Sequence, residues 1–361
     1  MSKAAELAAL IGSQSALSNR NMIINGSMAI SQRGTSSTGQ GASDLFLVDR
    51  FHLNTNGNSA GRFTVTQESD GPSGIPNSLK LACTTADTSI AASERFFIEQ
   101  RLEGQNLQRI KKGTSDAQAI TVSFYVKGNA SATYVVGIYD SDNSRQIGAQ
   151  FSVTTSWNRV SVTFPADTGG SALDDDNAES LSLRFYLHAG STYTGGTLQT
   201  TWDTAVNNEQ VGSGTTSFFD STSRTFFLTG VQLEVGETAT PFEHEPYGVT
   251  LQKAQRYYLS VKNQTNYAPI GVGRAWSGTN GNAAYYFPCE MRSNPTVSVA
   301  SLSKFDIVPS GGNPTAVQND GGNLQSVKVG FQQTAGITNG AFYQFEFGNN
   351  TDGDLRFDAE L

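Results

Sequence analysis

The sequence is poor in charge, in histidine and in cysteine. Only 16% of its 361 residues are charged, and it holds three histidines and two cysteines. Three imidazoles provide few side chains that titrate near neutral pH. The sequence also has no Gly-x-Ser-x-Gly elbow, no Gly-rich phosphate loop and no His-x-x-x-His spacing. We therefore expect a non-enzymatic protein with no catalytic residues and no cofactor.

A basic surface and a long apolar run are also missing. The net charge is −8, and the densest basic spot is Arg109, Lys111 and Lys112, whereas phosphate binding needs a clustered basic surface. No apolar run approaches the ~18 residues that span a membrane. Residues 1–11 lack the pattern of a secretory signal. We expect no nucleic-acid partner, no membrane insertion, synthesis in a host cytoplasm and two reduced cysteines.

Glycine and aromatic residues are abundant instead. There are 37 Gly, 21 Phe and 12 Tyr, a mixture typical of β-sandwiches, in which short strands alternate with tight turns. Residues 119–127 give the clearest strand, because Ile120, Val122, Phe124 and Val126 alternate with mostly polar residues. Further strands are predicted at 62–67, 79–84, 95–101, 134–139, 150–154, 159–164, 181–187 and 225–235.

This number of strands, with no convincing helix among them, indicates a two-sheet sandwich. An eight-stranded jelly roll fits it best. Residues 225–235 form its last strand, in which Phe227, Val231 and Leu233 are expected to share one face.

The chain is predicted to have three parts and a mostly β fold. Residues 1–18 contain a short amphipathic helix at 3–11. Residues 19–248 form the jelly roll, and residues 249–361 form a smaller C-terminal β-sandwich. Strands in this last part are predicted at 251–261, where a helix is the alternative, and at 283–287, 296–300, 305–308, 326–331, 341–347 and 355–359.

Several short strings follow one another along the chain. They are NRNMIINGSM at 19–28, DRF at 49–51, TGVQLE at 229–234, ATPFE at 239–243 and QRYY at 255–258. In content and order they resemble the tail fibre and receptor-binding virion proteins of bacteriophages, although that family often has Cys where Ala254 stands. The resemblance implies a jelly roll similar to carbohydrate-binding modules, a place on the phage tail or particle surface, and a trimer.

The candidate glycan-binding residues are Trp202, Tyr193 and Trp276. Sugars dock on aromatic faces that are flanked by polar groups. Trp202 and Tyr193 belong to a Gly-containing polar segment that precedes residue 218, and Trp276 lies in a similar loop at 273–281. For each ring, packing against the core is the alternative.

Asp174, Asp175 and Asp176 are the candidate metal ligands. Adjacent carboxylates suit Ca²⁺, a hard ion that prefers oxygen ligands. An exposed acidic turn is the alternative, and the loop has no EF-hand pattern.

The leading hypothesis is a phage virion structural protein, a tail fibre or appendage that attaches to host-surface glycans without covalent chemistry. A capsid or tail decoration protein without receptor binding is the alternative, and a polysaccharide depolymerase is the third. We expect a homotrimer held by the N-terminal helix and the C-terminal domain, whose many aromatic residues exceed what a small domain buries easily. The N-terminal segment is expected to contact other virion proteins.

Overall fold

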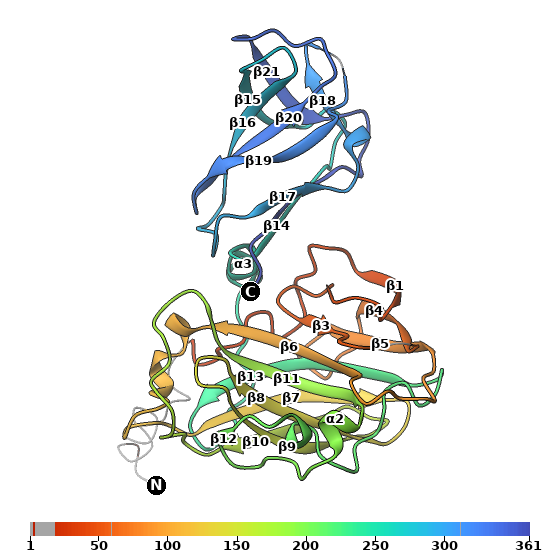
Figure 1. Cartoon of the computed structure of the whole chain (residues 1–361), viewed down its shortest axis with the longest axis vertical. Helices are drawn as coiled ribbons and strands as arrows, with labels where there is room; N and C mark the ends of the chain where they lie inside the picture. The colour runs from red at the N-terminus through yellow and green to blue at the C-terminus, as the bar shows by residue number, and fades with distance from the viewer. Residues whose placement is uncertain (1–2, 4–18, 59, 311) are drawn as a thin grey trace. The chain divides into compact units, whose positions relative to one another are not determined.

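The computed structural model describes residues 3, 19–58, 60–310 and 312–361 (Figure 1). The helix predicted at 3–11 therefore lies outside the described residues, apart from Lys3. The protein divides into two compact units, Met1–Tyr247 and Gly248–Leu361. Both are built mainly of antiparallel strands, which confirms the predicted mostly β fold.

The first unit is a jelly-roll sandwich of two sheets. The six-stranded sheet has the order β1 (Ser36–Gln40), β4 (Arg62–Glu68), β5 (Ser78–Thr85), β13 (Thr225–Val235), β7 (Ile120–Gly128) and β10 (Asn158–Phe164). The seven-stranded sheet has the order β12 (Asp203–Thr204), β9 (Arg145–Val153), β8 (Ala132–Asp140), β11 (Glu179–Ala189), β6 (Arg95–Glu103), β3 (His52–Asn54) and β2 (Leu45–Phe46). Short helical segments in its loops are η2 (Gly104–Asn106), η3 (Gln108–Ile110), α2 (Ser191–Thr194) and η4 (Asn207–Glu209).

The core of this unit fills the space between the two sheets. On β7, Val122 and Phe124 are fully buried, as the alternation of the sequence predicts. The Phe124 ring lies edge-on to Phe151 at 5.1 Å and to Phe185 at 4.9 Å, a geometry that aromatic quadrupoles favour. The Phe124 ring of β7 therefore contacts two strands of the opposite sheet, β9 and β11.

One predicted face is wrong, on β13. Phe227 does not share a face with Val231: it lies outside the main core, 6.1 Å from the Trp157 ring, while its neighbour Phe226 is buried between the sheets. The pairing with β7 slips at Gly230, whose φ of 59° falls in the left-handed region. The extra residue of this β-bulge reverses the alternation of the strand.

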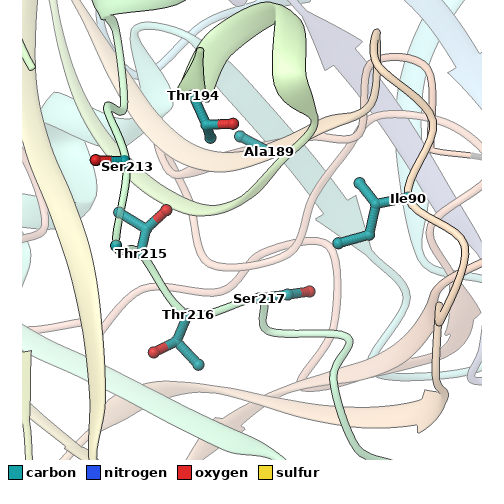
Figure 2. A pocket seen from close by; sticks show the side chains of 8 residues that line it. Ile90, Ala189, Thr194, Ser213, Thr215, Thr216 and Ser217 are labelled. Atoms are coloured by element: carbon teal, nitrogen blue, oxygen red, sulfur yellow. The ribbon is translucent and has the colours of Figure 1, made fainter. Parts of the chain in front are cut away.

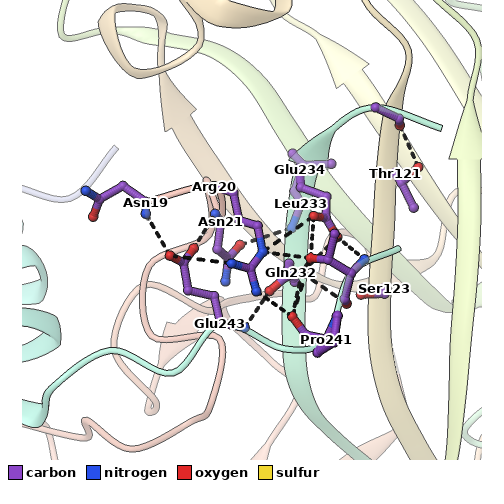
Figure 3. Close-up of polar contacts among 12 residues, drawn as sticks. Asn19, Arg20, Asn21, Thr121, Ser123, Gln232, Leu233, Glu234, Pro241 and Glu243 are labelled. Atoms are coloured by element: carbon purple, nitrogen blue, oxygen red, sulfur yellow. Dashed lines mark hydrogen bonds and ion pairs between the residues drawn. The ribbon is translucent and has the colours of Figure 1, made fainter. Parts of the chain in front are cut away.

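A network of polar contacts, which we call the clasp, joins the start of the jelly-roll unit to its end (Figure 3). The Glu243 carboxylate accepts the backbone N–H groups of Asn19 over 2.7 Å and Asn21 over 2.8 Å. The Arg20 guanidinium donates to the Thr240 hydroxyl over 2.7 Å. The other members are Gln232 and Glu234, which both bond to Thr240.

The clasp explains three of the strings that carry the resemblance to phage proteins. Its residues come from positions 19–28, 229–234 and 239–243, which are far apart in sequence. In this chain those strings therefore have a structural use, because they fix the point where the backbone enters and leaves the sandwich.

The second unit contains two smaller sheets. The three-stranded sheet has the order β14 (Tyr258–Lys262), β22 (Asp354–Asp358) and β17 (Thr296–Val299). The six-stranded sheet has the order β18 (Phe305–Val308), β21 (Phe342–Phe347), β15 (Pro269–Ala275), β16 (Asn280–Tyr286), β20 (Ser326–Gln332) and β19 (Ala316–Gly322), and η5 (Leu302–Lys304) precedes β18.

The strand predicted at 251–261 is wrong in its first half. Residues 251–255 belong to α3 (Tyr247–Gln255), and only the second half enters β14. Thr250 and Ala254 are the buried residues of α3, four positions apart on one helical face. The hydrophobic period therefore changes from helix to strand inside the predicted segment.

Cys83 and Cys289 are free thiols, as predicted. Within the part of the chain that the structure describes, no helix has the length and apolar character needed to cross a membrane.

Candidate functional site

Two of the predicted glycan-binding rings, Tyr193 and Trp202, are engaged in packing. Tyr193 is buried, and the Arg95 guanidinium lies 4.6 Å from its ring centre. Trp202 is half-buried against the main core, and its indole N–H donates to the Pro165 carbonyl over 2.8 Å. Neither ring forms an open platform.

Asp174, Asp175 and Asp176 lie in an exposed loop. The backbone N–H of Asp174 donates to the carboxylate of Asp142 over 3.0 Å. Their carboxylates do not converge: among the described residues, the three-ligand cluster that the structure forms lies elsewhere, at Asp87, Glu94 and His188. The three aspartates therefore lie in an exposed acidic loop and form no three-ligand group with one another among the described residues.

The outer face of the seven-stranded sheet carries a polar cluster that the sequence analysis missed. Glu99 on β6 is 1% exposed and lies 3.0 Å from His52, 3.1 Å from Arg184 and 2.9 Å from Arg101. Burial alone would raise the pKa of Glu99, but the hydrogen bond from His52 and the two guanidinium groups hold it at about 2. The Glu99 carboxylate is thus already paired with side chains of its own sheet.

The apolar half of the same sheet face is covered by the chain itself. Phe97, Val135 and Tyr186 project from β6, β8 and β11, and Tyr193 and Val211 of the following loops pack over them. The jelly-roll unit therefore offers a ligand no open aromatic surface on this part of the sheet.

An open aromatic surface does occur on the outer face of the six-stranded sheet of the second unit. Trp276, in the bend that directly follows β15, is 56% exposed, and Phe342 on β21 is 71% exposed. Phe342 is paired directly with Arg274, so these two side chains lie on one face of the sheet. Trp276 lies one residue beyond β15, and its backbone N–H donates to the Asn280 carbonyl over 3.0 Å. This bond continues the pairing of β15 with β16 by one residue, so Trp276 extends the face that carries Arg274. We call Trp276, Arg274, Phe342 and the adjoining Val272 the aromatic platform.

The polar groups of the platform are available for a ligand. Within the described residues, neither the Arg274 guanidinium nor the Trp276 indole N–H has a hydrogen-bond or ion-pair partner. Val272 is 63% exposed beside them. The arrangement combines apolar ring faces with free N–H donors, which is the chemistry that binds a molecule bearing both C–H faces and hydroxyl acceptors.

Only one of these four residues is predicted from the sequence as a ligand-binding residue. Trp276 was recognised from its Gly-rich loop, whereas Arg274 and Phe342 were not, because β15 was not predicted. Its sequence, Pro269–Ala275, contains two glycines that conceal the alternation. The pattern of Val272, Arg274 and Trp276 at every second position is the signal that could have found it.

Most of the aromatic residues that were predicted to exceed the capacity of the second unit are buried in its own core. Tyr343, Phe345 and Phe347 are buried, and Tyr285 and Phe287 pack against the same core. Tyr286, which is 76% exposed, and Phe342 remain outside.

The sequence matches no protein-family model and no curated protein. Among solved structures, it is similar to the enzymatically active domain of tailspike protein 4 from bacteriophage CBA120, with 14% identity and a TM-score of 0.31 over 60% of this chain and 21% of that chain. The chain thus spans about a fifth of the length of that tailspike chain.

Two carbohydrate-binding modules are also similar to this chain. One is the family 11 module from Clostridium thermocellum in complex with a mixed-linked tetrasaccharide, with 11% identity and a TM-score of 0.29 over 57% of this chain and 98% of that chain. The other is a xylan-binding domain from Paenibacillus barcinonensis, with 14% identity and a TM-score of 0.27 over 56% of this chain and 94% of that chain.

Proposed function

We propose that this chain is a non-enzymatic structural protein of a phage virion, a tail fibre or appendage component that attaches to host-surface glycans through the aromatic platform. The observation that carries glycan binding is the pair of exposed rings, Trp276 and Phe342, beside the unpaired Arg274. The virion assignment is supported by the order of the strings at 19–28, 229–234 and 239–243.

A sugar fits the platform better than a purely apolar ligand does. The C–H faces of a pyranose pack on aromatic rings, and its hydroxyls accept N–H donors of the kind that Arg274 and Trp276 present. Exposed apolar patches rimmed by polar groups mark binding sites on soluble proteins. The jelly-roll unit is the weaker location, because its own loops cover Phe97 and Tyr186.

A glycan array tests the proposal. Labelled full-length protein is applied to host capsule and lipopolysaccharide fragments, together with Trp276→Ala and Phe342→Ala. We expect specific binding by the natural chain and a loss of at least about tenfold in each variant, the effect typical of a central aromatic contact.

Tyr247→Ala is the matched control. Tyr247 is 63% exposed at the start of α3 and is outside the platform, so its removal should leave binding unchanged. Equal binding by Trp276→Ala and the natural chain would exclude the platform as the glycan site.

The second candidate function is a capsid or tail decoration protein in which copies of this chain cover the platform. The exposed Phe342 and Tyr286 rings favour it, because contact between subunits removes apolar surface from water. In both proposals the protein is a homotrimer. Light scattering and the glycan array together separate them: dissociation of the trimer by Phe342→Ala, with no glycan bound by the natural chain, favours the decoration protein.

The depolymerase is the third candidate. The His188 ring lies between Ser217 and Glu94: its Nδ1 is 2.7 Å from the Ser217 Oγ, and its Nε2 is 3.4 Å from Glu94 Oε2. The same Oγ accepts the backbone N–H of Phe219 over 3.1 Å, so a turn already engages this hydroxyl. Incubation with host polysaccharide provides the test, and shortening of the polysaccharide chains would replace the non-enzymatic proposal.

A further inference from the structure

Three metal-ligand side chains meet inside the jelly-roll unit. Asp87 follows β5, Glu94 precedes β6, and His188 lies near the end of β11, so the cluster connects segments of both sheets. One ligand atom from each lies within 4.8 Å of the others, and the three residues are at most 3% exposed. Buried carboxylates are held in proteins by a charged partner, by hydrogen bonds or by a metal.

Asp87 has an oxygen that the protein does not satisfy. Its Oδ1 accepts the backbone N–H of Ser89 over 2.9 Å. Its Oδ2 is buried and has no hydrogen-bond partner among the described residues. An unpaired buried carboxylate oxygen is unfavourable, and native structures keep one only for a reason such as an ion that binds there.

His188 is oriented as a metal ligand. Its Nδ1 lies 2.7 Å from the Ser217 hydroxyl, and its Nε2 points at Glu94 Oε2 over 3.4 Å. When Nδ1–H donates to Ser217, the Nε2 lone pair is left for a metal, as in sites where a second hydrogen bond fixes the imidazole.

The distance from His188 to Glu94 also fits a metal. At 3.4 Å it is longer than a normal N–H···O bond. In a tetrahedral zinc site with bonds of about 2.0–2.2 Å, neighbouring ligand atoms lie roughly 3.3–3.6 Å apart. The two side chains thus already have the spacing of neighbouring ligands, and Asp87, whose ligand oxygen lies within 4.8 Å of both, needs to approach by no more than about 1.5 Å.

A pocket of about 250 Å³ lies beside Ser217, the partner of His188 (Figure 2). Thr194, Ser213, Thr215, Thr216 and Ser217 line it with hydroxyl groups. Ser217 is therefore both a wall of the pocket and the partner of His188 Nδ1, so one side chain separates the pocket from the imidazole of the cluster.

We propose that Asp87, Glu94 and His188 bind a divalent transition-metal ion, Zn²⁺ above all, with a water molecule as the fourth ligand. Imidazole nitrogen favours Zn²⁺ over Ca²⁺ and Mg²⁺, which take mostly oxygen ligands. The ion neutralises two buried carboxylates and ties the end of β5 to β6 and β11. It is a structural staple across the sandwich, independent of the platform, which belongs to the other unit.

Zinc titration of the untagged full-length protein tests this proposal. After dialysis against EDTA, we expect one Zn²⁺ per chain in competition with a chromogenic chelator. At a hundredfold excess over Kd, the melting temperature should rise by roughly 5 °C. Co²⁺ in place of Zn²⁺ should give the visible absorption of a tetrahedral site.

Asp87→Asn and Asp175→Asn form a matched pair of variants. Asp87→Asn keeps the shape of the side chain but removes its charge, and it should weaken Zn²⁺ binding at least about tenfold. Asp175→Asn makes the same change in the exposed loop and should bind as the natural chain does.

Three results would overturn the proposal. They are no Zn²⁺ or Co²⁺ binding at micromolar concentrations, a thermal shift with Ca²⁺ but not with Zn²⁺, and equal Zn²⁺ binding by Asp87→Asn and the natural chain. If Asp87→Asn does not fold, the Zn²⁺ stoichiometry and the Co²⁺ spectrum of the natural protein decide the question alone.

Discussion

The backbone N–H of Asn19 donates to Oε1 of Glu243 over 2.7 Å, although 224 positions separate the two residues in sequence. The other oxygen of the same carboxylate accepts the N–H of Asn21. One side chain therefore holds residues 19–21, at the entry to the jelly roll, against the segment that follows β13.

Removal of this carboxylate should destabilise the jelly-roll unit. Glu243→Ala deletes two hydrogen bonds to a charged, mostly buried acceptor, and we expect a loss of roughly 2–3 kcal/mol in the free energy of unfolding. Urea unfolding in a Trp276→Phe background measures it, since Trp157 and Trp202 then report on the first unit alone. Glu237→Ala, an exposed carboxylate on the same connection, should change stability by less than about 0.5 kcal/mol.

Neighbouring aromatic residues on β7 should differ in their contribution. Phe124→Ala empties a fully buried site between Phe151 and Phe185, which costs about 3–5 kcal/mol. Tyr125 points to the opposite, partly exposed face, so Tyr125→Ala should cost clearly less in the same urea assay. Equal losses would mean that the two faces of β7 are assigned wrongly.

Gly230 and Gly248 should respond to alanine with opposite signs. A Cβ on Gly230 would lie 2.8 Å from the ring of Tyr125, in a backbone conformation with positive φ. Gly230→Ala should therefore cost at least about 1–2 kcal/mol. Nothing lies within 4 Å of a Cβ on Gly248 in α3, and there alanine should be neutral or stabilising. Thermal melts of the two variants make the comparison.

Acid should weaken the first unit through Glu99. The pKa of Glu99 is about 2 in the folded protein, against an ordinary value of 4.5. Its folded-state pKa is lowered, so its contribution is present above pH 4.5 and is lost as the pH falls toward 2. The contribution is roughly 3 kcal/mol.

Glu99→Gln separates this contribution from general acid sensitivity. The variant should be less stable at pH 7 and should lose less of its remaining stability than the natural chain between pH 4.5 and pH 2. Urea unfolding at a series of pH values provides the comparison, with Asp175→Asn as the exposed control. Parallel pH profiles for Glu99→Gln and the natural chain would contradict the assignment.

Strands with long uninterrupted alternation could be predicted from the sequence. The segment predicted at 119–127 is β7, and the one predicted at 305–308 is β18. Alternation fails where the backbone departs from the regular pleat. The bulge at Gly230 reversed the predicted face of Phe227, and glycine, which has no side chain to mark a face, concealed β15.

The candidate site could be predicted only in part. Trp276 is visible in the sequence because tryptophan in a polar, Gly-rich loop is conspicuous. Its relation to Phe342 depends on the pairing of β15 with β21 across nearly 70 positions, and one strand does not reveal the register of another. The same holds for the Asp87, Glu94 and His188 cluster, whose members share no local motif.

The clasp also determines how the chain carries mechanical load. A force that pulls residue 19 away from residue 243 does not stretch the sandwich along its strands, because these points of entry and exit are adjacent. The tension falls first on the Asn19–Glu243 and Asn21–Glu243 hydrogen bonds. Until these bonds and those of Arg20 to Thr240 and Pro241 break, the strands of the jelly roll bear no tension, although more than 200 residues lie between the two ends.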